Sequence, residues 1–236
     1  MIESKREFND YFLPLLNDCY NMYTFLGRVF EKEITADFLE KIAEKTFAYL
    51  KIERLQEIPD EQLREGLKVL SRYLESLKNQ DLKQAELELA VEYANLFLGV
   101  KGLPPPSESA YKSGLLIERA TEEVLQAYWR TGVRVKVKEE FREPADHIAV
   151  ELHFAAHLCR KAAENLEKGR KNEAERYLEA RRDFLDKHLL SWVPSLTRNI
   201  WKTAETDFYK GLALITERFL RLDRALITYM LRELSK

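Results

Sequence analysis

Residues 205–234 read ETDFYKGLALITERFLRLDRALITYMLREL, thirty residues with a single glycine and no proline. Apolar side chains recur in this stretch about every 3.5 residues, which is a helical repeat, and a second apolar series lies on another side of the same helix. The first series alone could form a coiled-coil seam, but a helix that is apolar on two sides is usually buried centrally in a domain. We therefore predict a long central helix. The first series is Phe208, Leu212, Ile215, Phe219, Leu222, Leu226 and Tyr229, and the second is Leu214, Leu220, Ile227 and Met230.

The rest of the chain favours helices as well. Its 236 residues include only 8 glycines and 7 prolines, about half of the usual frequency, so turns are scarce and a fold of many short strands is excluded. Five of these fifteen residues fall between Gly99 and Pro106. We predict an all-α fold, one domain over residues 1–236, with about nine to eleven helices. The other helices are expected near 12–30, 37–54, 59–79, 81–98, 118–131, 144–168, 172–189 and 194–202, with an extended loop at 133–138.

Charge and targeting signals narrow the class of protein. Lys and Arg number 38 and Asp and Glu 40, so no global positive field would attract nucleic acid or an anionic membrane. No signal peptide and no apolar run of about 18 residues is seen, which favours a cytoplasmic protein with no stable membrane insertion. Cys19 and Cys159 lie on apolar helical stripes and are expected to be buried thiols.

Two histidines have the spacing of a metal-ligand pair. His153 and His157 are separated by one helical turn, as in zinc sites, but Phe154 stands where a metalloprotease has its glutamate. On a helical wheel, His147 and Glu151 face another direction and do not complete the site. A metal-dependent hydrolase is therefore an alternative, and an ordinary solvated histidine pair is the simpler interpretation.

A second polar group follows Glu143 and Pro144. If proline opens a helix here, Asp146 lies in the first turn, where the helix dipole favours an anion. His147 and Glu151 border the apolar face of the same helix. The group is therefore either simple charge matching at a helix start or part of a binding site.

The loop from Gly99 to Pro106 also has two interpretations. In the first, it only connects two helices; in the second, its three consecutive prolines present a stiff segment to a partner at little entropic cost. It contains no phosphate-binding loop, and no catalytic triad can be assigned anywhere in the chain. The sequence patterns thus assign no catalytic residue, no metal site and no cofactor.

Three segments carry a resemblance to a known family. YANLFLG at 93–99 followed by PSESAY at 106–111, and EPADHIAVELHF at 143–154, resemble the YxxLFxG…PxESxY and ExPDHIxxELxF signatures of the TorD/DmsD redox-enzyme maturation chaperones. A looser match is Phe184, His188 and Trp192. The sequence departs from the family pattern at Val100, Ala145 and Ala155, and the last two could alter the depth or selectivity of a binding groove.

The resemblance implies an all-helical cytoplasmic chaperone that is not an enzyme. Such proteins bind the twin-arginine signal peptide of a molybdopterin-containing oxidoreductase subunit and delay its export until the cofactor is inserted. Arginines need carboxylates, and the apolar part of the peptide needs a groove. The resemblance implies peptide-binding roles for Tyr93, Leu96, Phe97, Gly99, Pro106, Glu108, Ser109, Tyr111, Glu143, Pro144, Asp146, His147 and Glu151.

Within that set, the carboxylates of Glu108, Asp146 and Glu151 are expected to face the arginines. The partner would be the precursor of a molybdoenzyme catalytic subunit, and no nucleic acid is expected. Long helices would also allow a homodimer. A non-catalytic helical scaffold, whose last helix pairs with another subunit, is a further alternative.

Overall fold

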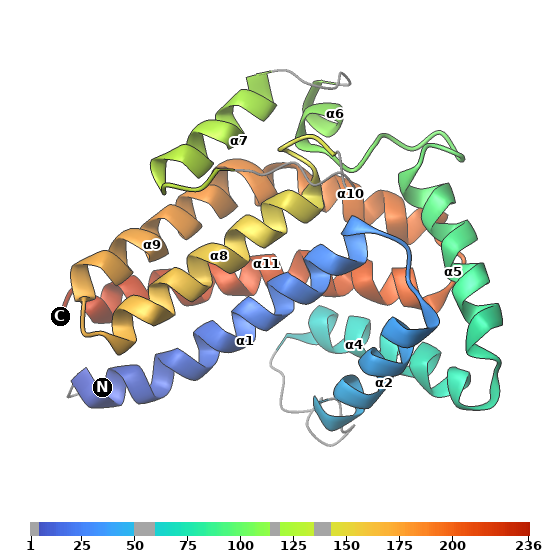
Figure 1. Ribbon diagram of the computed structural model, residues 1–236, viewed down its shortest axis with the longest axis horizontal. Coiled ribbons are helices and arrows are strands. Elements are labelled where there is room, and N and C mark those ends of the chain that lie inside the picture. The colour runs from blue at the N-terminus through green and yellow to red at the C-terminus, as the bar shows by residue number, and fades with distance from the viewer. Residues whose placement is uncertain (1–4, 50–59, 114–118, 135–142) are drawn as a thin grey trace. The chain divides into compact units, whose positions relative to one another are not determined.

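The computed structural model describes residues 5–49, 60–113, 119–134 and 143–236. Every regular element in these residues is a helix, and the ten α-helices among them lie within the predicted range, so the all-α prediction is confirmed (Figure 1). The elements are α1 (Lys5–Glu31), α2 (Ala36–Tyr49), α4 (Glu61–Ser76), the 3₁₀ turn η1 (Leu77–Asn79), α5 (Leu82–Phe97), α6 (Glu108–Ser113), α7 (Arg119–Arg130), α8 (Ile148–Glu167), α9 (Lys171–Phe184), the π-helical turn η2 (Leu185–Leu189), α10 (Leu190–Thr203) and α11 (Asp207–Leu234).

The chain forms two compact units. Unit 1 comprises residues 1–31, 107–192 and 220–236, and unit 2 comprises residues 32–106 and 193–219. Both α10 and α11 contribute residues to each unit. The expectation of one domain over the whole chain stays a prediction.

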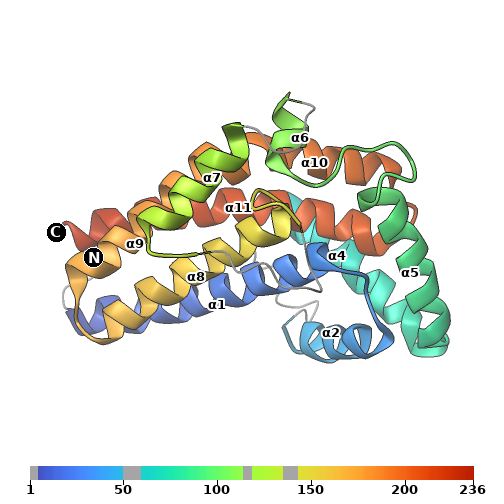
Figure 2. The ribbon, with the colours of Figure 1, turned by 45° about the horizontal axis from the view of Figure 1, so that its top comes forward.

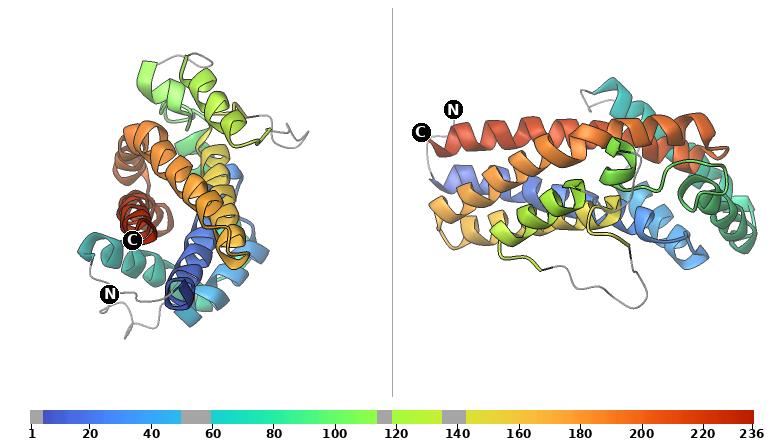
Figure 3. Two further views of the ribbon diagram at one scale, coloured as in Figure 1. Left: turned by 90° about the vertical axis from the view of Figure 1, so that its left-hand side faces the viewer. Right: turned by 90° about the horizontal axis from the view of Figure 1, so that it is seen from above.

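Unit 1 is built on α1, α8, α9 and the second half of α11. Helix α1 packs along α8 and α8 packs along α9, as the adjacent ribbons in Figures 1 and 3 show. A buried ion pair joins α9 to α11, because Nη2 of Arg181 lies 3.1 Å from Oδ1 of Asp223. Asp223 also accepts hydrogen bonds from Tyr23 at 2.7 Å and Cys19 at 3.3 Å, both on α1. One carboxylate thus connects three helices.

The two cysteines are free and buried, as predicted. The guanidinium of Arg181 donates to the sulfur of Cys159, yet burial raises the pKa of that thiol to about 12. Both cysteines are therefore protonated and serve as packing residues at neutral pH.

Helix α7 lies beside α9 in the ribbon (Figure 2), and aromatic rings connect it to α8 and α9. The ring of Tyr128 lies 4.4 Å from that of Phe154 and 5.9 Å from that of Phe184, centroid to centroid. The Tyr128 hydroxyl donates to the backbone oxygen of Ala145 at 2.8 Å. This bond ties α7 to the segment that precedes α8.

Unit 2 contains α2, α4, α5 and the parts of α10 and α11 that belong to it. Helices α4 and α11 approach closely at Gly66 and Gly211, where an added Cβ would lie 2.9 Å from atoms of the other helix. Buried Glu92 of α5 accepts hydrogen bonds from the backbone N–H groups of Glu205 and Thr206, just before α11. A carboxylate is favoured there because the N–H groups at a helix start lack partners within the helix.

Two expected helix boundaries are wrong. Pro144 does not open α8, which begins at Ile148 with His147 as its N-cap. Pro194 does not begin a helix either, because it lies inside α10, which continues from α9 through η2. The predicted extended loop falls mostly on residues outside the described ranges.

Two other helices begin directly after a residue whose side chain caps the helix. The side chains of Thr35 and Asp60 accept from the backbone N–H groups of Phe38 and Leu63, at 3.3 Å and 2.8 Å. Among the described helices, none has both the length and the apolar character needed to span a bilayer.

Candidate functional site

Two signature segments meet in unit 1. Ser107 and His147 form an isolated antiparallel β-bridge, and the N–H of Glu108 donates to the backbone oxygen of Asp146 at 2.9 Å. The carboxylate of Asp146 accepts from the N–H of Ser109 at 2.8 Å and so caps the start of α6. Residues almost forty positions apart are therefore joined by backbone and side-chain hydrogen bonds.

Glu108 is fully buried and ionised. Its Oε2 lies 2.9 Å from Nδ1 of His188, and its Oε1 accepts from the ammonium of Lys112. Burial alone would raise the pKa of Glu108, but the bonds with His188 and Lys112 outweigh burial and hold the pKa below its usual value. Lys112 also donates to the backbone oxygen of Lys187 at 3.2 Å and is about one-third exposed.

Glu151 is as buried as Glu108, but its carboxyl group is protonated. Burial and the nearby negative charge of Glu108 raise its pKa well above the usual value. Its Oε2 accepts from the indole N–H of Trp192 at 3.2 Å. A protonated Glu151 can donate to Glu108, so one of the two carboxyl groups is charged and the other neutral.

His147 acts as a neutral cap. Its Nδ1 accepts from the N–H of Ala149 at 3.2 Å, and burial lowers the pKa of the imidazole to about 4. The ring is therefore uncharged at neutral pH, with its proton on Nε2.

The meeting point contains buried oxygen atoms without partners. Among the described residues, Oγ of Ser107, Oγ of Ser109, Oδ1 of Asp146 and Oε1 of Glu151 make no hydrogen bond. A proton shared with Glu108 accounts for Glu151. The other three remain unpaired: Oδ1 of Asp146 can only accept, and the two serine hydroxyls can accept or donate. Unpaired buried polar groups are unusual enough in proteins to need an explanation.

Ser107, Glu108, Ser109, Asp146, His147 and Glu151 are called the cluster below. The remaining predicted residues of unit 1 lie at its edge. The ring of Tyr111 lies 5.4 Å from that of buried Trp192. Glu143 is exposed and Pro144 is half-buried, and the backbone oxygen of Pro144 accepts from the N–H of His147.

The other predicted residues belong to unit 2. Tyr93, Leu96 and Phe97 are buried there, and the ring of Phe97 lies 5.7 Å from that of Tyr209. Gly99 ends the helix with a φ of 76°, a left-handed conformation that favours glycine. Pro106, also buried, is the last residue of this unit before the cluster begins. A single site formed by all thirteen residues stays a prediction.

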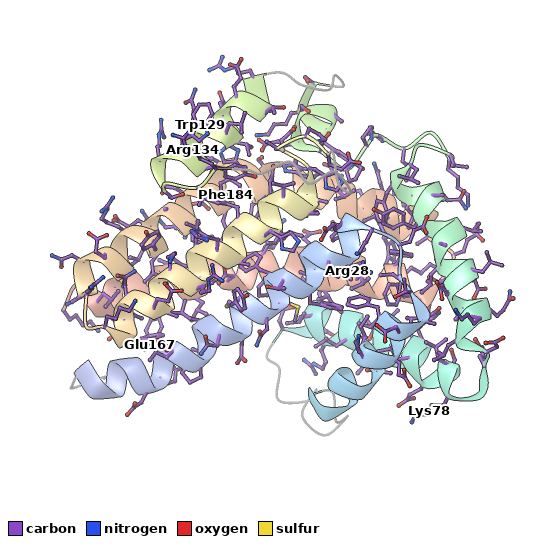
Figure 4. All side chains as sticks on the ribbon, in the orientation of Figure 1. Arg28, Lys78, Trp129, Arg134, Glu167 and Phe184 are labelled. Atoms are coloured by element: carbon purple, nitrogen blue, oxygen red, sulfur yellow. The ribbon has the colours of Figure 1, made fainter. Side chains whose placement is uncertain are left out.

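A pocket of about 490 Å³ lies beside the cluster within unit 1. It is lined by residues of α7, α8, α9 and η2, with Phe154 and Phe184 among its apolar residues and His188 at its boundary with the cluster; Phe184 is labelled in Figure 4. Acidic and basic side chains both line it, so it shows no preference for one charge.

The histidine pair shows no metal-site geometry. His153 lies 3.3 Å from Oε2 of Glu31 on α1, and burial lowers the pKa of His157. In the described part of the chain, no three metal-ligating side chains lie close enough to hold an ion.

Comparison with known proteins agrees with the signature segments. The family described as "Nitrate reductase delta subunit" matches residues 56–198, more than half of the chain. A chaperone protein TorD from Vibrio parahaemolyticus is 34% identical over 157 residues, which cover 65% of this chain and 69% of that protein. The chain belongs to the TorD/DmsD family of redox-enzyme maturation chaperones.

Other members of this family match nearly the whole chain. A chaperone protein TorD from Aliivibrio fischeri is 29% identical over 208 residues, covering 86% of this chain and 91% of that protein. A third, from Vibrio cholerae, is 29% identical over 228 residues, covering 94% and 97%. The N-terminal helices, which carry no signature, thus lie within the region that is similar to TorD chaperones.

Three residues that contact the cluster were not among the predicted site residues of this TorD/DmsD chain. His188 and Trp192 belong to the looser third match, and their spacing of four residues was the signal that could have identified them. Lys112 follows Glu108 by four residues, the spacing of an ion pair along a helix, and this spacing could have identified it.

Proposed function

We propose that this chain is a cytoplasmic, non-catalytic chaperone that binds the twin-arginine signal peptide of a molybdopterin-containing oxidoreductase precursor. Binding would hold the precursor back from export while it folds and receives its cofactor. Family membership supports the chaperone role, and the cluster in unit 1 supports the peptide-binding role.

The observation that carries the proposal is the set of unpaired acceptors where the signature segments meet. Oγ of Ser107, Oγ of Ser109 and Oδ1 of Asp146 are buried and unpartnered. A guanidinium group has five N–H donors in a planar arrangement and no acceptor. All three atoms can accept from an arginine side chain, and the carboxylate oxygen of Asp146, which can only accept, disfavours a carboxylate or phosphate at the same place.

Lys112 occupies the position at which such an arginine would enter the cluster. Its ammonium is bound to the buried carboxylate of Glu108 but is itself partly exposed. A lysine holds a carboxylate as a point charge, whereas arginine can bind it through two parallel hydrogen bonds. We propose that a client arginine displaces Lys112 from Glu108.

The first test replaces the carboxylates. Titration calorimetry would use twin-arginine leader peptides of molybdoenzymes from the same organism, with copies in which both arginines are glutamine as controls. We expect Asp146→Asn or Glu108→Gln to weaken binding about tenfold, a loss of about 1.4 kcal/mol. Asp37→Asn, an exposed carboxylate in unit 2, is the matched control. Unchanged affinity in both cluster variants would reject this site.

The second test concerns Lys112. If a client arginine takes its place, Lys112→Gln removes the competitor and we expect binding to become about three- to tenfold tighter. A purely structural role for the Lys112–Glu108 pair predicts weaker binding and a lower melting temperature. The same titration, together with thermal unfolding, separates these outcomes.

A further inference from the structure

The apolar part of a leader peptide needs contacts close to the cluster, and the predicted apolar residues do not supply them. Tyr93, Leu96 and Phe97 are buried inside unit 2 at 6%, 1% and 4% exposure, where they pack within that unit. The pocket described above, in contrast, belongs to the same unit as the cluster. Its surroundings therefore decide whether it can hold part of the peptide.

The pocket lies between α7 and α9, which are side by side in the ribbon (Figure 2), and has a volume of about 490 Å³. Its lining includes the buried rings of Phe154 and Phe184, whose centroids lie 4.8 Å apart. Ala127 of α7 and Ala180 of α9 also line it, and both are only partly exposed. Volume and apolar lining are those of pockets that bind ligands in other proteins.

Two residues of η2 connect the pocket to Glu108. His188 lines the pocket, and its Nδ1 lies 2.9 Å from Oε2 of Glu108. Lys187 lines the pocket too, and its backbone oxygen accepts from the ammonium of Lys112 at 3.2 Å. Lys112 is thus bound both to the buried carboxylate and to a residue of the pocket wall. A client arginine in the place of Lys112 would therefore bring its neighbouring residues to the pocket.

The charges around the pocket balance. Its lining has two exposed acids and two exposed bases, namely Glu123, Asp183, Arg130 and Lys187, and Asp183 pairs with Lys187 at 3.3 Å. Charged residues beside the lining are again of both signs, including Arg119, Glu122, Glu179 and Arg182. An anionic or cationic ligand needs an excess of the opposite charge, so neither is favoured. A neutral peptide segment fits better, because its backbone offers both donors and acceptors to such a rim.

The volume limits how much of a leader the pocket can hold. An α-helix with its side chains is about 10 Å wide and rises about 5.4 Å per turn, so one turn occupies roughly 420 Å³. The pocket therefore has room for a few side chains and not for a whole apolar segment. The residues nearest the arginines are the ones within reach, since an extended chain advances only about 3.3–3.6 Å per residue.

We infer that the pocket between α7 and α9 binds the apolar side chains nearest the arginines of the leader peptide, while an arginine binds Glu108 in the adjoining cluster. This inference rests on the proposed function and adds the place in unit 1 that supplies apolar contacts. The cluster selects the positive charge, and the pocket selects an apolar residue at a short distance from it. Together they recognise a short motif and not the overall hydrophobicity of the leader.

The test uses the full chain and the leader peptides described above, and it fills the pocket. Ala180→Phe on α9, or Ala127→Phe on α7, places a ring where the leader side chains would lie, and each should weaken binding at least tenfold. Ala90→Phe, at a partly exposed alanine of α5 in unit 2, is the matched control and should bind as wild type does. Thermal unfolding of all three variants checks that they are folded.

Leader variants identify the side chains that enter the pocket. One leader carries serine in place of the apolar residue nearest the arginines, and a control leader carries serine in place of its last apolar residue. The first change should weaken binding to wild-type protein about tenfold but hardly affect binding to Ala180→Phe, a coupling that a double-mutant cycle measures. Glu108→Gln should weaken the binding of both leaders by the same factor.

The outcomes are distinguishable. If wild-type protein does not bind the leaders, the proposed function fails and the inference fails with it. If Glu108→Gln weakens binding but both pocket variants bind as tightly as Ala90→Phe, the function stands and the inference is wrong. If the pocket variants do not fold, a leader with a photoreactive phenylalanine at its first apolar position decides the question with wild-type protein. Its cross-links should fall on α7 or α9, and cross-links confined to unit 2 would reject the inference.

Discussion

Glu108 and Glu151 show how one buried cluster keeps two neighbouring carboxyl groups without two buried negative charges. Glu108 has a lysine and a histidine as partners and stays ionised. Glu151 has only the neutral indole of Trp192 and the negative charge of Glu108, so it keeps its proton. The partners, and not the depth of burial, decide which carboxyl group is charged, since both side chains are fully buried.

This arrangement predicts a specific pH dependence of stability. The pKa of Glu151 is raised in the folded chain, so above its ordinary value of 4.5 the unfolded chain loses a proton that the folded chain retains. Glu151 therefore makes the protein less stable as pH rises from about 4.5 toward the folded pKa. We expect Glu151→Gln to remove up to about 1.4 kcal/mol of loss per pH unit in this window.

Urea unfolding at pH 4.5, 6 and 7.5 would measure this effect. The advantage of Glu151→Gln over wild type should grow with pH, while Glu88→Gln, an exposed change on α5, should show no such trend. Parallel pH curves for wild type and Glu151→Gln would contradict the neutral state of this carboxyl group.

At the scale of elements, the segment before α8 determines where that helix begins. The bridge between Ser107 and His147 and the cap formed by Asp146 on α6 keep residues 144–147 out of the helix. His147 then starts the helix through its side chain. His147 therefore takes part in the bridge to Ser107, just before α6, and is also the N-cap of α8.

Substitutions of His147 should separate its two properties. Asn is a good N-cap and Ala is not, so His147→Ala should be about 1 kcal/mol less stable than His147→Asn at pH 7. Because burial lowers the pKa of His147 to about 4, the folded chain does not bind the proton that the unfolded chain binds below 6.5. Wild type should thus lose stability between pH 6.5 and 4, and both variants should lose less, as thermal unfolding at pH 7 and 5 would show.

The helices themselves could be predicted from the sequence because their signals are local. Apolar spacing and the caps at Thr35 and Asp60 lie within a few residues of each helix start. The helix starts predicted at Pro144 and Pro194 are wrong because the signals that decide them are not local. Proline tolerates a helix start without requiring one, and contacts distant in the chain decided where α8 and α10 begin. The pairing of Glu108 with His188 is also distant in the chain, whereas Lys112 lies only four residues from Glu108.

At the scale of the whole molecule, the polar contacts of Asp223 connect three helices of unit 1. Arg181 and Asp223 are completely buried, and Tyr23 and Cys19 bring α1 to the same carboxylate. Buried ion pairs add little net stability, but removing one partner leaves the other charge without compensation.

We therefore expect Asp223→Asn to lower the free energy of unfolding by about 3–5 kcal/mol. Asp186→Asn is the matched control, because Asp186 pairs with Arg224 of the same helix α11 at 3.0 Å but is partly exposed, and its loss should cost no more than about 1 kcal/mol. Urea denaturation measures both. Similar losses in the two variants would show that the polar contacts of Asp223 are not a principal support of unit 1.

The π-helical turn η2 has an evolutionary consequence. A π turn contains one residue more than the α-helical turn that it replaces, and this extra residue sets the directions of His188 and Trp192 toward Glu108 and Glu151. Deleting one residue from Leu185–Leu189 would restore a regular helix and rotate Trp192 by about 100° relative to α9. Insertions and deletions that surface loops accept freely should therefore be eliminated by selection in this five-residue segment, although its composition looks ordinary.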